Sequence, residues 1–150
     1  MNESSLRRAL ALALLVFAGA VAAQQAPQSL PAIRLNAGIH NITAQFARTP
    51  EQREIGLMFR PSMAANEGML FAFESPKQQC FWMKNTLLPL AIAFVADDGS
   101  IVNIDSMKPQ TLDGHCSTKP VRFVLEMNEG WFAKRGIKAG SRLRGEPFAK

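Results

Sequence analysis

The sequence predicts a small, mainly β protein whose strands form a barrel-like or rolled sheet, with one or two short helices. Short apolar segments bounded by turn residues recur along the chain, as they do in small β barrels. Helical signals occur only near Thr49 and near Gly130, and both stretches are short. Because the predicted strands do not alternate with long helices, a doubly wound parallel sheet is not expected.

The first 23 residues have the pattern of a secretory signal peptide. Arg7 and Arg8 form a positive start, residues 9–18 are apolar, and small residues lead up to Ala23. We predict cleavage near Ala23. An uncleaved anchor is the alternative, although the apolar run is shorter than the roughly 20 residues that span a membrane.

After cleavage, residues 24–31 are expected to form a flexible leader and residues 32–150 a single domain. The predicted location is periplasmic or otherwise extracytoplasmic, with membrane contact only through an uncleaved signal segment. The net charge of the whole chain is +5, with basic residues concentrated near the C-terminus. Such a surplus suits acidic partners or lipid headgroups, whereas the export signal argues against nucleic acid.

The chain has only two cysteines, Cys80 and Cys116. In an exported protein, an isolated pair predicts one disulfide, which here would close a loop of about 37 residues and contribute roughly 3 to 4 kcal/mol. The alternative is a reactive thiol at Cys116 beside His115. No second cysteine has the two-residue spacing of thiol oxidoreductases.

The N-terminal part of the domain predicts a hairpin and then a short helix. Residues 33–35 and 40–46 flank a turn at residues 36–38. Thr49 is the predicted N-cap, with Pro50 at the first helical position and Gln52 completing a capping box. The helix is expected to end around Phe59, because Pro61 cannot continue it.

The stretch from Cys80 to Asn85 predicts a central strand. Alternation places Cys80 and Trp82 on one face and Phe81 and Met83 on the other, so both faces begin apolar. Strands are also expected around residues 69–73, 87–95, 101–104, 121–127 and Leu143, with a loop over 106–120 and a helical turn over 130–135.

Four sequence blocks carry a family resemblance. They are Arg53 with Gly56-Leu57-Met58-Phe59-Arg60, Gly68-Met69-Leu70-Phe71 with Phe73, Phe81-Trp82-Met83-Lys84-Asn85-Thr86 with Pro89, and Leu125-Glu126 before Gly130. Over about residues 39–144 the chain resembles the domain of unknown function family 192, small exported or membrane-associated bacterial and archaeal proteins. The resemblance implies a compact, mostly β fold and an extracytoplasmic setting, and supplies no reaction. Many members have Pro-Leu-Asp where this chain has Pro89, Leu90 and Ala91, so no role of that acid is carried over.

The candidate site is a rim at the polar end of the predicted central strand. Oriented polar groups beside an apolar hollow are typical of ligand sites, and an indole can stack on a sugar ring. We therefore predict a non-catalytic binding or accessory module for a glycan or another envelope component. Its site residues would be Arg60, Trp82, Lys84, Asn85, Thr86 and Glu126.

Other interpretations of these residues stay open. Lys84, Asn85 and Thr86 could form a solvated turn, Trp82 could be core, and Arg60 or Lys84 could simply neutralise Glu126. A protein-assembly factor, a periplasmic copper-handling protein that uses the methionines, and an uncharacterised enzyme are alternative functions. With two histidines and no recognisable catalytic motif, we assign no catalytic residue, metal ligand or cofactor.

Overall fold

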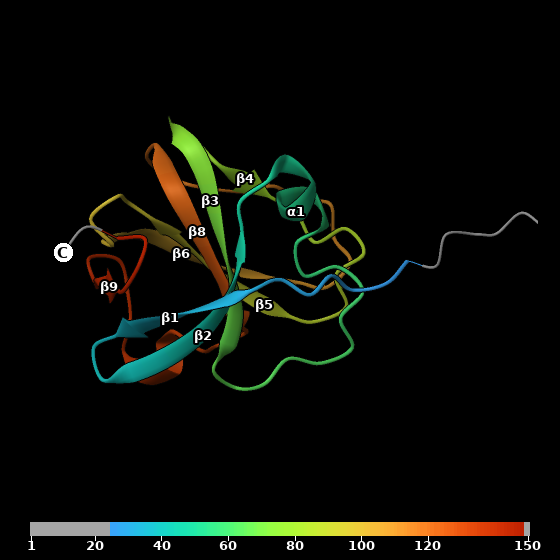
Figure 1. The fold of residues 1–150 in the computed structure, drawn as a ribbon, viewed down its shortest axis with the longest axis horizontal. Helices are drawn as coiled ribbons and strands as arrows, with labels where there is room; N and C mark the ends of the chain where they lie inside the picture. Colours follow the sequence, from blue (N-terminus) through green and yellow to red (C-terminus); the bar gives the residue numbers. More distant parts are fainter. Residues whose placement is uncertain (1–24, 149–150) are drawn as a thin grey trace, which may run out of the picture.

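Nine β-strands, one short α-helix and one 3₁₀ turn make up residues 25–148, the part of the chain that the computed structural model describes (Figure 1). The predicted signal peptide lies outside these residues. No helix within residues 25–148 is both long enough and apolar enough to cross a membrane. In chain order the elements are β1 (Ala32–Ala37), β2 (His40–Ala47), α1 (Pro50–Ile55), β3 (Glu67–Lys77), β4 (Cys80–Phe81), β5 (Leu90–Val95), β6 (Ile101–Met107), β7 (His115–Cys116), β8 (Val121–Asn128), η1 (Ala133–Arg135) and β9 (Leu143–Arg144).

Seven strands form one strongly curled sheet in the order β6-β5-β8-β3-β2-β1-β9. All neighbours are antiparallel except β2 and β3, which run parallel. The two ends of the sheet approach each other, since Ser100 and Arg142 form an isolated bridge and the Ile101 N–H donates to the Ser141 carbonyl at 2.8 Å. The prediction of a mainly β, rolled sheet is therefore confirmed.

The sheet is covered on both faces by apolar side chains. One core cluster contains Leu125 and Met127 of β8, and the other contains Val124 of the same strand. Because side chains alternate along a strand, Glu126 shares its face with Val124 rather than with Leu125. The expected strand over 121–127 is thus present, with both of its faces buried.

The predicted hairpin and helix start are confirmed. β1 and β2 pair through Ala37 and His40, and the Thr49 side chain accepts from the Gln52 N–H in a complete capping box. The helix ends at Ile55, earlier than the expected end at Phe59. Gly56 ends it by adopting a φ of 49°, a backbone conformation that favours glycine.

The predicted central strand over Cys80 to Asn85 is wrong. Only Cys80 and Phe81 form a strand, β4, and it pairs with β7 in a separate two-stranded sheet. The inner positions of the main sheet include β8, which pairs with β5 on one side and with β3 on the other. Local alternation predicted an extended segment but could not show which partner it would find.

The disulfide between Cys80 and Cys116 is confirmed. The two cysteines face each other across β4 and β7, so the bond ties together the two strands of the small sheet. This sheet packs on the main one through Phe81, whose ring lies 4.9 Å from that of Phe71 in β3.

Part of the expected flexible leader is attached to the domain. The Gln28 side chain donates to the carbonyls of Gln52 and Gly56, and the Leu30 N–H donates to the Gln45 side chain. These bonds hold residues 28–30 beside α1 and β2, in contrast to the expected loose leader.

Replacement of Gly68 by alanine is expected to destabilise the fold. A Cβ there would collide with the carbonyl oxygen of Glu126 and the sulfur of Met127. We expect Gly68→Ala to lower the free energy of unfolding by about 1 to 3 kcal/mol, measured by urea denaturation. Gly114→Ala is the control, because nothing lies within 4 Å of its Cβ position. Equal stability of the two variants would contradict the close approach of β3 and β8.

Removal of the disulfide is expected to lower the free energy of unfolding by roughly 3 kcal/mol, because the unfolded chain gains conformational freedom. The double variant Cys80→Ala, Cys116→Ala should therefore unfold at a lower urea concentration than the wild type. Reductant should shift the wild type in the same direction and leave the double variant unchanged. A wild type that is insensitive to reductant would rule out this stabilising role.

Candidate functional site

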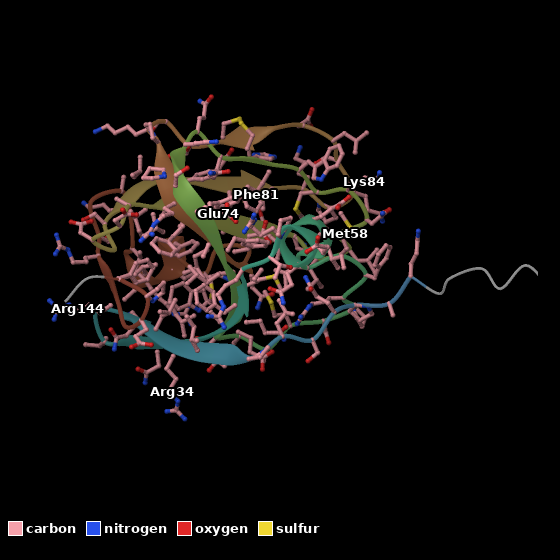
Figure 2. The ribbon with its side chains drawn as sticks, turned by 45° about the horizontal axis from the view of Figure 1, so that its top comes forward. Arg34, Met58, Glu74, Phe81, Lys84 and Arg144 are labelled. Atoms are coloured by element: carbon pink, nitrogen blue, oxygen red, sulfur yellow. A yellow bond between two sulfur atoms is a disulfide. The ribbon has the colours of Figure 1, made fainter. Side chains whose placement is uncertain are left out.

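A hollow of about 200 Å³ lies between the end of α1, the outer part of β3 and the segment that follows β4. Figure 2 shows the labelled Met58 and Phe81 near α1, and Arg34 and Arg144 away from it. We call this hollow the Glu126 pocket. Its lining residues are Arg53, Glu54, Ile55, Gly56, Leu57, Met58, Phe71, Phe73, Gln79, Cys80, Phe81, Trp82, Thr86 and Glu126.

Glu126 is the buried acid of this pocket, with only 4% of its surface exposed. In the sheet register it stands opposite Met69 of β3 and Ile92 of β5, neither of which can donate a hydrogen bond. Nor does any other described residue donate to its carboxyl group or form an ion pair with it. Burial raises the pKa of Glu126 to about 8, so the carboxyl group is mostly protonated at neutral pH.

Aromatic rings form much of the pocket wall. The Phe81 ring meets Phe71 and Phe73 edge to face, with centroids 4.9 and 6.2 Å apart. Trp82 is half exposed, and the Lys84 Nζ lies 5.4 Å from the centroid of its ring. The interpretation of Trp82 as a core residue is therefore wrong, because its indole reaches solvent.

Arg53 of α1 is occupied by contacts within the protein. Its Nη1 donates to the carbonyls of Arg48 and Ala72 at 2.6 and 2.8 Å, and its Nη2 pairs with Glu74 at 3.1 Å. The guanidinium also stacks on the Phe73 ring at 4.8 Å. Arg53 thus fixes the wall between α1 and β3.

The turn formed by Lys84, Asn85 and Thr86 connects the pocket wall to the segment after α1. Asn85 has a φ of 53°, and its carbonyl accepts a hydrogen bond from the Phe59 N–H at 2.9 Å. Asparagine tolerates this conformation better than most residues. Thr86 is buried and its hydroxyl donates to the Lys84 carbonyl. Residues 84–86 therefore form a turn with local hydrogen bonds, as the alternative interpretation expected. Thr86 nevertheless also lines the pocket.

Arg60 lies outside the Glu126 pocket. Its Nη2 donates to the Gln28 carbonyl at 2.8 Å and to the Gln45 side chain at 2.7 Å, beside a separate hollow of about 80 Å³. Arg60 and Glu126 form no ion pair. The expected rim is therefore divided: Trp82, Thr86 and Glu126 line one pocket, Lys84 and Asn85 flank it, and Arg60 stabilises another region. Ligand binding by these residues remains a prediction.

Sequence reasoning missed the aromatic wall. Phe71 and Phe73 were assigned to an apolar strand, and Phe81 to the interior of a central strand. The sequence feature that points to these three rings is their position in the blocks of the family resemblance. All four blocks contribute lining residues to the same pocket.

The other groups considered from the sequence lie elsewhere. The Asp105 carboxylate contacts the His115 Nδ1 at 2.6 Å, beside Cys116 in β7 and away from the lining of the Glu126 pocket. Residues 25–148 contain no group of three or more His, Cys, Asp or Glu that could hold a metal ion. Met69, Met83 and Met107 belong to one apolar core cluster, with Met63 packed against it, and Met127 belongs to the other.

Comparison with known proteins relates this chain to an uncharacterised family. The family model of DUF192, described as "Uncharacterized ACR", matches residues 32–145, and the chain therefore belongs to the domain of unknown function family 192. No curated protein matches it significantly.

Two solved structures are similar over most of their length. A Sinorhizobium meliloti 1021 protein, described as a candidate transcription regulator, is 38% identical with a TM-score of 0.72, over 79% of this chain and 98% of that one. A Novosphingobium aromaticivorans protein of unknown function is 33% identical with a TM-score of 0.74, over 80% of this chain and 93% of that one.

The pH dependence of stability is expected to report on Glu126. Between pH 4.5 and about 8 the unfolded chain has released this proton while the folded protein keeps it. The folded state therefore loses relative stability as pH rises through this window, by up to about 1.4 kcal/mol per pH unit. Glu126→Gln should remove that slope in urea denaturation.

Glu129→Gln is the matched control, because Glu129 is exposed and lies in the turn directly after β8. It should retain the wild-type slope. If Glu126→Gln and the wild type lose stability in parallel across the window, Glu126 is not a buried protonated acid.

Proposed function

We propose that this protein is an exported, non-catalytic binding module of the cell envelope whose ligand enters the Glu126 pocket. The observation that carries the proposal is the Glu126 carboxyl group, which has no hydrogen-bond partner among the described residues and whose oxygens border the aromatic hollow, since the Nε of Arg60 is the one fully sealed side-chain nitrogen or oxygen left unpaired in residues 25–148. Buried polar groups are normally paired, so an unpaired one in a hollow is best explained by a ligand or by water that completes it.

The size of the pocket favours a small ligand or one group of a larger component. Its volume is about 200 Å³, whereas sites for drug-sized molecules occupy roughly 300 to 1,000 Å³. A dry cavity of about 150 Å³ is already sufficient for benzene. The half-exposed Trp82 can cover the outer part of such a ligand.

The residues of the family resemblance support binding as the role of this domain. The blocks that contain Gly56, Phe71, Phe81 and Glu126 are far apart in the sequence, yet they meet around one hollow. Three other polar lining groups have internal partners: Arg53 pairs with Glu74, the Thr86 hydroxyl donates to the Lys84 carbonyl, and Cys80 is in the disulfide. We therefore assign recognition rather than a reaction to the pocket.

The proposed envelope location is supported by the signal-peptide pattern and the disulfide, which is typical of oxidising compartments. The description of the Sinorhizobium protein as a candidate regulator applies to that protein. A protein-assembly role is the second candidate, favoured by the exposed apolar side chains of Trp82 and Leu87, and would need a partner protein rather than a small ligand.

Three ring compounds of equal size test the proposal: benzyl alcohol, benzylamine and benzoate. At roughly 10 mM, where ligands with millimolar affinity are largely bound, at least one should shift the Trp82 indole signal in ¹H–¹⁵N NMR spectra. Trp82→Ala should weaken the binding of that compound. Leu112→Ala, which removes another exposed apolar side chain, should leave its binding unchanged. If none of the three perturbs signals from the pocket, the proposed function is wrong.

A further inference from the structure

We propose that the Glu126 pocket binds a small organic ammonium ion, with the Glu126 carboxylate as its counter-charge. This inference rests on the proposed function and specifies the chemical class of the ligand. Three features carry it: the isolation of the carboxyl group, the aromatic wall, and the pairing of Arg53, the one cationic side chain in the pocket lining of the described residues, with Glu74.

The first feature is that no side chain of the described residues donates to the Glu126 carboxyl group or pairs with it, so its carboxylate form has no internal counter-charge. Carboxylates buried in proteins are almost always paired with a positive charge. Here Met69 and Ile92 are its neighbours across the sheet, and Arg60 has its Nη2 occupied elsewhere. An ammonium group can supply both the missing charge and N–H donors, in a site where charge-assisted hydrogen bonds are strong.

The second feature is the aromatic wall. Phe73, Phe81 and Trp82 surround the hollow, and the negative faces of such rings attract cations. The protein already uses two of these rings in this way, since Arg53 stacks on Phe73 and Lys84 on Trp82. Among the described residues no side-chain cation lies over Phe81, whose ring contacts those of Phe71, Phe73 and Phe94 edge to face.

The third feature is the distribution of charge around Glu126. From α1, Arg53 and Glu54 line the pocket, and Arg53 is neutralised by Glu74 of β3. The segments of β3, β4 and β8 add no other titratable group to the lining, because Cys80 is in the disulfide. Lys84 lies outside the lining, over Trp82. No free positive charge inside the pocket therefore competes with a bound ammonium ion.

Binding of an ammonium ion must be linked to loss of a proton. In the empty pocket Glu126 keeps its proton up to a pH of about 8, because burial raises its pKa. The ligand binds the carboxylate form and releases this proton to solvent. Affinity should therefore rise about tenfold per pH unit below pH 8 and level off above it. A carboxylate ligand requires the protonated form and should show the opposite trend.

Titration calorimetry of the mature protein with benzylamine, benzyl alcohol and benzoate tests the inference. Benzylamine should bind best, gain about tenfold in affinity per pH unit below pH 8, and release close to one proton, counted from the dependence of heat on buffer. Glu126→Gln should lower the affinity for benzylamine at least tenfold and leave the affinity for benzyl alcohol unchanged. Glu129→Gln should bind all compounds as the wild type does.

The outcomes separate the two proposals. If benzyl alcohol or benzoate binds as tightly as benzylamine, or if benzylamine binds without proton release, the ammonium inference is overturned while the binding function stands. If none of the three binds, both fail. The proton count needs only the wild-type protein, so it decides the question even if Glu126→Gln does not fold.

Discussion

The structure depends on one constraint: an acidic side chain placed in the sheet where every neighbour across the strands is apolar. Glu126 faces Met69 on one side and Ile92 on the other. Ionisation there is unfavourable, because a carboxylate without partners loses its hydration. The fold accommodates this group by keeping a hollow beside it, and the layer above the sheet is built around that hollow rather than over it.

Three residues with unusual backbone conformations or close backbone contacts hold the segments around the pocket together. Gly56 turns the chain away from α1 against the Phe71 ring, and Gly68 lets β3 approach the backbone of β8 at Glu126. Asn85 makes the turn whose carbonyl binds the Phe59 N–H. These positions belong to the sequence blocks of the family resemblance. The blocks therefore contribute both to the walls of the pocket and to the contacts beside it, since Arg60 and Gly68 line the neighbouring hollow.

Local signals in the sequence predicted the elements that depend on local chemistry. The capping box at Thr49, the hairpin before it and the disulfide were all found in this way. Long-range partners were not predictable, because alternation at Cys80 to Asn85 does not show whether a strand joins the main sheet or lies on top of it. For the same reason Arg60 and Glu126 were placed in one site, and only the fold shows that Arg60 bonds to Gln28 instead. The sequence suggested Glu126 as a polar group, but its isolation is a property of the packed sheet.

A direct measurement of the Glu126 pKa tests the central claim. The side-chain carboxyl carbon can be followed by ¹³C NMR during a pH titration of the ligand-free protein, with Glu126→Gln to assign the signal. The structure predicts a midpoint of about 8. A midpoint near 4.5, the ordinary value for glutamate, would mean that the carboxylate is hydrated or paired. That result would contradict the description of Glu126 as a buried acid without a partner in the protein.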